Sequence, residues 1–175
     1  LTVEQEKIWP YPFDTAASMI EMARKSGSSI AEMKRANERV VRSPEDLDAG
    51  LSRIWETMND CIGQGLAHEG ELPGSLRVKR RAKKIFDQLN AAHELNSRQP
   101  HEVFDWLNVY AMAVNEENAA GGVVVTAPTN GAAGVIPAVI RYYLDHCIDP
   151  EPDNIPEFLL TAAAIGGLIK HNASI

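Results

Sequence analysis

Apolar residues recur at steps of three and four along most of this chain of 175 residues. The pattern is clearest after Ser43-Pro44-Glu45-Asp46, where a capping serine, a proline at the first helical position and acidic side chains mark a helix start. The apolar positions that follow are Leu47, Leu51, Ile54, Trp55, Met58, Cys61 and Ile62. Because such steps place side chains on one face of an α-helix, the segment predicts a long amphipathic helix that ends near Gly63 and Gly65.

The same periodicity predicts helices over most of the remaining chain. The expected ranges are 14–25, 29–42, 79–95, 101–118, 135–147 and 155–170. The last range is apolar and rich in alanine and glycine, which is typical of a buried helix. Only residues 123–126 are typical of a strand. We therefore predict an all-α fold: one multi-helix, bundle-like domain over residues 1–175, with a glycine-rich buried turn between helices.

The charge and the apolar pattern exclude several classes of function. A net charge of −7 argues against nucleic-acid binding, which requires a basic face. The short basic cluster Arg77–Lys84 is interpreted as a solvated helical face. No apolar run reaches the ~18 residues of a membrane span, and no signal-peptide pattern opens the chain. A cytoplasmic protein is expected.

The chain contains two cysteines, Cys61 and Cys147. They form no CxxC pair, and no histidine accompanies them at metal-ligand spacing, so the sequence predicts no metal site within this chain. A structural disulfide stays open. Free thiols, packed or partly exposed, are the favoured interpretation.

Residues 115–134 carry the most informative local pattern. The apolar run 123–125 follows Gly121-Gly122, which lets the backbone approach its neighbours closely. Asn130-Gly131 predicts a turn because both residues tolerate positive φ, and the helix expected next has Pro137 in its first turn. One interpretation of this segment is a tight, buried helix–helix crossing that requires small residues.

The other interpretation is a binding site for a small anion. Backbone N–H groups and the hydroxyls of Thr126 and Thr129 are expected to converge at the N-terminus of the following helix. The N–H groups and the helix dipole at that end favour a negative charge such as a carboxylate.

Several motifs together point to one family. They are Tyr11-Pro-Phe13, Leu72-Pro-Gly-Ser-Leu-Arg-Val78, Asp105-Trp106, the segment Asn115–Gly134, Ile136-Pro-Ala-Val139 with Tyr142-Tyr143, and Lys170-His-Asn-Ala-Ser-Ile175. In this order they resemble the α domain of iron–sulfur-dependent L-serine dehydratase, also called L-serine deaminase. The resemblance covers nearly the whole chain.

The resemblance implies a lyase that converts L-serine to pyruvate and ammonia. In that family a 4Fe–4S cluster is the Lewis acid, and an iron without a protein ligand coordinates the serine hydroxyl. The family's cluster-binding cysteines follow the segment that matches residues 172–175, and its Ser-Ser-Ser-His-Thr motif belongs to a β domain that would precede residue 1. The resemblance therefore predicts a fragment, truncated before the cluster ligands, that binds no cluster itself and is inactive alone.

The resemblance also implies the partners and the substrate site. L-serine is the expected substrate, the β domain or subunit is the expected partner, and a homodimer stays open. The residues expected to bind substrate, or to hydrogen-bond near the cluster, are Thr126, Thr129, Asn130, Gly131, Asn172 and Ser174. Lys170 is the candidate catalytic residue in the same pocket, holding the substrate carboxylate or acting as a base. The alternative is a lysine that stabilises a helix C-terminus through the dipole.

Three positions depart from the family pattern. Val123 stands where the family usually has Arg, Ala133 where many relatives have Cys, and Ile169 where Tyr is frequent. The first change removes a charged contact expected near the pocket, which weakens detailed predictions of substrate recognition.

Other titratable residues are weaker candidates. Surface or capping roles are favoured for the five histidines, which show no His-x-x-x-His spacing: His68, His93, His101, His146 and His171. His171, next to Asn172, is the one nearest the predicted site. The pair Glu116-Glu117 could act as acid or base, although a solvated pair near a helix end is the favoured interpretation.

Two other functions stay open. A related L-cysteine desulfidase-type lyase is one, since a cluster that activates a hydroxyl could also activate a thiol. A non-catalytic binding or assembly module is the other.

Overall fold

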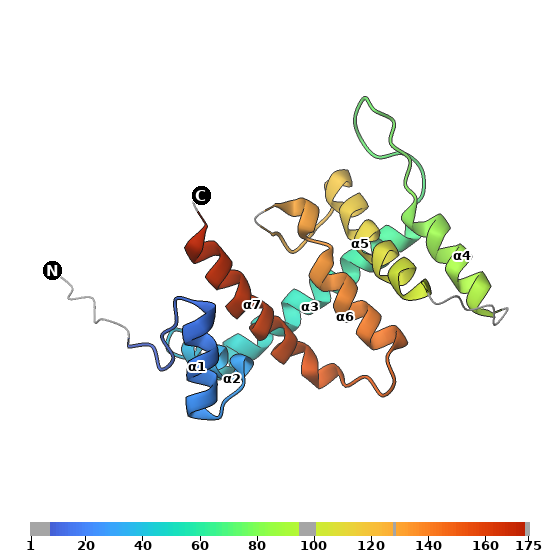
Figure 1. Cartoon of the computed structure of the whole chain (residues 1–175). Helices are drawn as coiled ribbons and strands as arrows, with labels where there is room; N and C mark the ends of the chain where they lie inside the picture. The colour runs from blue at the N-terminus through green and yellow to red at the C-terminus, as the bar shows by residue number, and fades with distance from the viewer. Residues whose placement is uncertain (1–7, 95–100, 128, 174–175) are drawn as a thin grey trace. The chain divides into compact units, whose positions relative to one another are not determined.

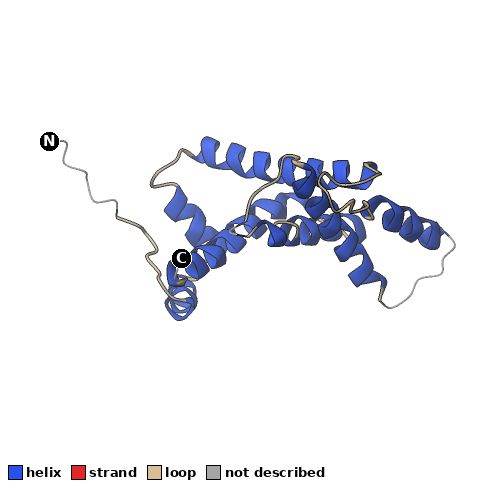
Figure 2. Ribbon diagram, turned by 90° about the horizontal axis from the view of Figure 1, so that it is seen from above, coloured by secondary structure: helices blue, strands red, loops and turns tan. Residues whose placement is uncertain are grey.

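The computed structural model describes residues 8–94, 101–127 and 129–173, and this part of the chain is all-α, as predicted. Figures 1 and 2 show helices joined by loops. The α-helices are α1 (Ala16–Ser26), α2 (Ile30–Glu38), α3 (Pro44–Ala67), α4 (Ala82–Glu94), α5 (Glu102–Ala120), α6 (Val135–His146) and α7 (Ile155–Asn172). Two short 3-10 helices, η1 (Asn130–Ala132) and η2 (Pro152–Asn154), precede α6 and α7.

The chain divides into two compact units, and the boundary between them lies inside α3. The first unit comprises Leu1–Ser52 and Asp153–Ile175, and the second comprises Arg53–Pro152. The single domain over residues 1–175 stays a prediction. None of the described helices is long and apolar enough to cross a lipid bilayer.

The starts of the first three helices follow the capping signals of the sequence. Thr15 and Ser29 each form a capping box with the third helical residue of α1 and α2. The Ser43 hydroxyl accepts a hydrogen bond from Asp46 N at 3.1 Å, as expected for the cap of α3. The end predicted for α3 is wrong, because the helix continues through Gly63 and Gly65 to Ala67.

The start predicted for α4 is also wrong, because the helix begins at Ala82 rather than Lys79. Residues 68–81 form a loop that projects between α3 and α4 (Figure 1). An isolated antiparallel bridge joins Glu71 to Lys79, and Arg80 N donates to Gly70 O at 2.8 Å. These hydrogen bonds keep Lys79 and Arg80 out of the helix.

The first unit is built on the packing of α2 against α7, with α1 alongside. Its small core contains Met19, Met33 and Ala164. Tyr11 and Asn37 exchange two hydrogen bonds, of 2.9 and 2.8 Å. The prediction that α7 is buried holds for its first half only, since Ile169 is 66% exposed.

The second unit is organised around α5, which packs against α4 and α6. The buried core residues are Cys61, Ile62, Leu66, Ala82, Trp106, Val109, Tyr110, Ala113, Val114, Ala133 and Ala138. Glycine allows the backbones to approach closely at two points. A Cβ on Gly65 of α3 would lie 2.3 Å from Ala113 O, and a Cβ on Gly134 would lie 2.6 Å from Ala111 O.

Residues 123–126 do not form the predicted strand. They belong to an irregular stretch between Gly122 and Ala127, and Val123 is 79% exposed. A strand requires a neighbouring strand to satisfy its backbone groups, and the described residues provide none here. A short run of valines was therefore an insufficient signal.

Candidate functional site

The predicted anion site lies on the loop that joins α5 to α6. Gly121 ends α5 in the left-handed conformation, with φ of 81°. Thr126, Thr129 and Gly131 are exposed on the loop, and Asn130 is half-buried. The loop thus carries four of the residues predicted to bind substrate.

Asn130 is fixed by both ends of its side-chain amide. Its Nδ2 donates to Asn118 Oδ1 at 3.2 Å, and its Oδ1 accepts from Ala127 N at 3.3 Å. These contacts tie the turn to the last turns of α5. Asn130 therefore holds the loop in shape, and its contact with substrate stays a prediction.

The helix after the loop begins as the sequence predicts. α6 starts at Val135, with Pro137 in its first turn. Gly134 precedes it without a side-chain cap, so no side chain occupies the N-cap position of this helix. Gly134 also lies against the α5 backbone at Ala111. The structure therefore contains the tight crossing, and the anion site at this helix start stays a prediction.

Glu116 and Glu117 are both buried, and the favoured interpretation of a solvated pair is wrong. Glu116 accepts from Arg81 N at 2.7 Å and from Ala82 N at 3.3 Å, which caps the start of α4. Glu117 contacts Arg80 instead, at 2.6 Å. Arg80 is 8% exposed, so the basic cluster is not uniformly a solvated face.

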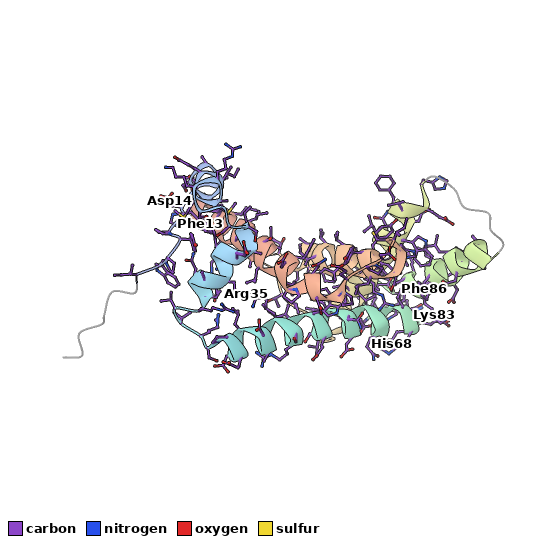
Figure 3. The ribbon with its side chains drawn as sticks, turned by 90° about the horizontal axis from the view of Figure 1, so that it is seen from below. Phe13, Asp14, Arg35, His68, Lys83 and Phe86 are labelled. Carbon is purple, nitrogen blue, oxygen red and sulfur yellow. The ribbon has the colours of Figure 1, made fainter. Side chains whose placement is uncertain are left out.

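The Nδ1 atom of His68 lies 2.9 Å from Glu117 Oε1, and the histidine side chain is 50% exposed. Figure 3 labels His68 at the end of α3, with Lys83 and Phe86 on α4. Burial by itself would raise the pKa of Glu117. The hydrogen bonds from His68 and Arg80, together with their charges, outweigh burial and hold that pKa below the ordinary value of a glutamate. Glu117 is therefore an ionised, buried carboxylate.

A cavity of about 410 Å³ lies beside this carboxylate. Its lining consists of Thr57, Asp60, Cys61, Gln64, Glu117, Gly122 and Val123. Burial raises the pKa of the Cys61 thiol to about 11, and the negative charge of Glu117 adds to the effect. Cys61 is therefore a neutral thiol at pH 7.

The remaining predicted site residues belong to the first unit. Lys170 is exposed in the last turn of α7, where a cation is also favoured by the helix dipole. Asn172 Nδ2 donates to Leu168 O at 2.8 Å and to Asp14 O at 3.3 Å. Ser174 lies outside the described residues. That Lys170 and Asn172 share a pocket with Thr126 stays a prediction.

The histidines have varied surroundings. His171 lines a pocket of about 560 Å³ in the first unit, together with Asn37 and Glu38. His146, for which a surface or capping role is expected, is half-buried and stacks on Tyr142 with 5.0 Å between the ring centroids. His101 is exposed at the start of α5 and makes no side-chain cap. The side chain of His93 lies outside the described part.

Comparison with known protein families matches residues 25–175 to the serine dehydratase alpha chain family. The match covers far more than half of the chain. This chain belongs to the serine dehydratase alpha chain family.

Individual members of the family are similar over nearly the whole chain. It is 46% identical to an L-serine dehydratase of Streptomyces coelicolor over 99% of its own length, and 46% identical to L-serine dehydratase 1 of Escherichia coli over 95%. An L-serine dehydratase of Helicobacter pylori is 40% identical over 94%. The chain spans 36–37% of the length of these curated relatives.

The described residues of this chain do not provide a ligand set for the iron–sulfur cluster that the resemblance implies for the family. Such a cluster is held by cysteine thiolates. Cys61 is buried with a raised pKa, Cys147 is exposed at the end of α6, and both are free thiols, as favoured from the sequence. Within residues 8–94, 101–127 and 129–173, no group of three His, Cys, Asp or Glu side chains is placed to hold a metal ion.

Proposed function

We propose that this chain supplies one wall of the substrate site of an L-serine dehydratase, which releases pyruvate and ammonia from L-serine. The loop between α5 and α6 supports the proposal. It presents Thr126 and Thr129 at the surface, close in sequence to the uncapped start of α6. Hydroxyls and backbone N–H groups at a helix N-terminus are suited to a carboxylate, and every amino-acid substrate carries one.

In this proposal the loop binds and orients. Thr126, Thr129 and the backbone at Gly131 hydrogen-bond the substrate carboxylate. Asn130 keeps the turn closed through Asn118 and Ala127. Fixing the carboxylate holds the rest of the amino acid in one orientation, which lowers the entropic cost of reaction. Lys170 is the candidate for a second charged contact or a base.

The other parts of the enzyme are also proposed. The cluster takes its ligands from residues other than these 175, and a β domain or subunit completes the site. We infer a cytoplasmic enzyme of amino-acid breakdown, and a homodimer is compatible with this proposal. The chain on its own is expected to be inactive.

The test is pyruvate release from L-serine after anaerobic reconstitution with iron and sulfide. The natural protein that contains this sequence is assayed beside the chain itself. The proposal is supported if the natural protein releases pyruvate and the chain alone does not. Turnover of L-cysteine with release of sulfide, in place of turnover of L-serine, favours the desulfidase-type lyase. No turnover of either amino acid favours a binding module. Activity of the chain alone would contradict the proposal that the cluster ligands lie outside these 175 residues.

A further inference from the structure

We propose that Glu117 is a positioning residue: its carboxylate, clamped by Arg80 and His68, sets the path of the loop that carries Thr126 and Asn130. The inference rests on the proposed function, because it assigns the loop to substrate binding. The contact between Glu117 and the start of the loop is not part of the anion site predicted from the sequence. Everything that supports it lies within the second unit.

The loop leaves α5 directly over the Glu117 side chain. Gly122 N donates to Glu117 O at 2.8 Å. A Cβ on Gly122 would lie 2.8 Å from Glu117 Oε2 and 3.1 Å from Glu117 O. A Cβ at 2.8 Å from the oxygen would force the carboxylate to move, so the observed place of the carboxylate requires glycine at position 122. The carboxylate therefore lies against the first residue of the loop, and the backbone of Glu117 is hydrogen-bonded to that residue.

The carboxylate is itself held from two distant segments. Arg80 reaches Glu117 Oε1 at 2.6 Å from the loop before α4, and its own backbone is fixed on Gly70 O. His68 reaches the same oxygen from the residue after α3. Each contact to an ionised group in a buried place is worth more than a neutral hydrogen bond. Together they leave Glu117 little freedom to move.

The next residue holds the far end of the same loop. Asn118 Oδ1 accepts from Asn130 Nδ2, whose own side chain accepts from Ala127 N. Consecutive residues at the end of α5 thus fix the loop at Gly122 and at Asn130. Thr126 lies between these two points. A shift of Glu117 would move the start of the loop and so displace the threonine hydroxyl.

Two other glutamates of the second unit provide matched controls. Glu116 is buried on the same helix, but its carboxylate faces the start of α4 rather than the loop. Glu56 is an exposed glutamate of α3. The variants E117Q, E116Q and E56Q therefore compare the same chemical change at three positions.

Hydrogen exchange of the chain measures the effect without any activity. In E117Q we expect amides within 121–127 to exchange about tenfold faster, since local opening responds to lost local contacts. E116Q should accelerate exchange at 81–86 instead, and E56Q should change neither region. Unchanged exchange at 121–127 in E117Q, or the same pattern in E116Q, would overturn the proposal.

A double-mutant cycle covers the case in which E117Q unfolds the second unit. Gly122→Ala forces a Cβ onto the carboxylate, while Glu117→Asp retracts that carboxylate by one methylene. We expect G122A to raise exchange in the loop several-fold less in the E117D background than in the wild type. Additive effects would mean that the two residues do not set each other's position.

Kinetics of the reconstituted natural protein provide the readout for substrate. E117Q should raise the KM for L-serine about tenfold while changing kcat less than threefold, because displaced donors weaken carboxylate binding. E56Q should leave both unchanged. An inactive wild-type protein would refute the proposed function but leave the exchange result standing. An active enzyme with normal KM in E117Q would refute the positioning role alone.

Discussion

The N-terminal half of α5 packs through the rings of Trp106 and Tyr110, whereas its C-terminal end packs through the carboxylates of Glu116 and Glu117. Trp106 contacts Phe86 edge to face at 5.8 Å and His146 at 4.5 Å between ring centroids. At the other end, both carboxylates bind the segment that leads into α4, and Glu117 also binds His68. We name these two regions the aromatic end and the carboxylate end.

The two ends of α5 differ in how well they tolerate the removal of side-chain atoms. The aromatic end depends on contact area, which declines gradually when atoms are removed. The carboxylate end depends on a few charged hydrogen bonds, and removal of one partner leaves a buried charge without compensation. A segment held in the second way is fixed in one position, which suits a loop proposed to orient a substrate.

The largest expected loss of stability is at the aromatic end. Trp106→Ala removes a buried ring and leaves a cavity, which should lower the free energy of unfolding by about 4 kcal/mol. Urea unfolding followed by circular dichroism measures it. Trp55→Ala is the control, because Trp55 is only half-buried and should cost less. Equal losses in the free energy of unfolding for the two variants would show that the aromatic end does not contribute more to stability than a half-buried tryptophan does.

The next effect is at the carboxylate end. Arg80→Met removes the buried cation that binds Glu117 and leaves that carboxylate with the half-exposed His68. We expect a loss of about 3 kcal/mol in the free energy of unfolding. Lys84→Met, in the same basic cluster, should change stability by less than ~0.5 kcal/mol. A small effect of Arg80→Met would mean that water reaches Glu117 readily.

A third prediction concerns the point between the two ends, where α3 crosses α5. Gly65→Ala places a Cβ 2.3 Å from Ala113 O, and should destabilise the protein by about 2 kcal/mol or more. Gly63→Ala is a matched control, since nothing lies within 4 Å of its Cβ position. It should stabilise the helix by ~0.5 kcal/mol. The same sign for both variants in urea unfolding would contradict the close crossing.

The glycines and glutamates also show which features of the structure can be predicted from the sequence. The helices were predictable because periodicity and capping residues are local, as Ser43 and Pro44 illustrate at the start of α3. From its neighbours in the sequence, Gly65 predicts a helix end. In the structure, glycine is required at this position by the backbone of Ala113, which is 48 positions away in the chain (113 − 65).

The candidate site follows the same division. The turn at Asn130 and the start of α6 were readable from neighbouring residues. The burial of Glu117 was not, because its partners lie 37 and 49 positions away. A pair of glutamates near a helix end looks solvated until the residues that cover it are known. Residues that act through distant partners therefore need the fold before their role can be inferred.

A smaller effect separates hydrogen bonding from packing at the aromatic end. Tyr110→Phe keeps the buried ring but removes the hydroxyl, which donates to Asp145 Oδ2 at 2.8 Å. The loss should be about 1 kcal/mol, since Arg141 still binds the same carboxylate. Denaturant unfolding of Tyr110→Phe beside Trp106→Ala tests this ranking. A loss as large as that of the tryptophan variant would make the aromatic end as dependent on single hydrogen bonds as the carboxylate end.

The smallest expected effect is a difference in acid sensitivity between the two ends. The pKa of Glu117 is held below its ordinary value, so its ionised form stabilises the fold at neutral pH, and that stabilisation is lost as pH falls through the lowered pKa. The stability gap between wild type and E117Q should therefore be full at pH 6–7 and shrink below about pH 4. The gap between wild type and Trp106→Ala should change less over this range, because the buried indole ring carries no titratable group. Urea unfolding at several pH values measures both gaps. A gap for E117Q that does not change with pH would mean that the Glu117 carboxylate does not titrate with folding, and the contrast between the two ends would then rest on geometry alone.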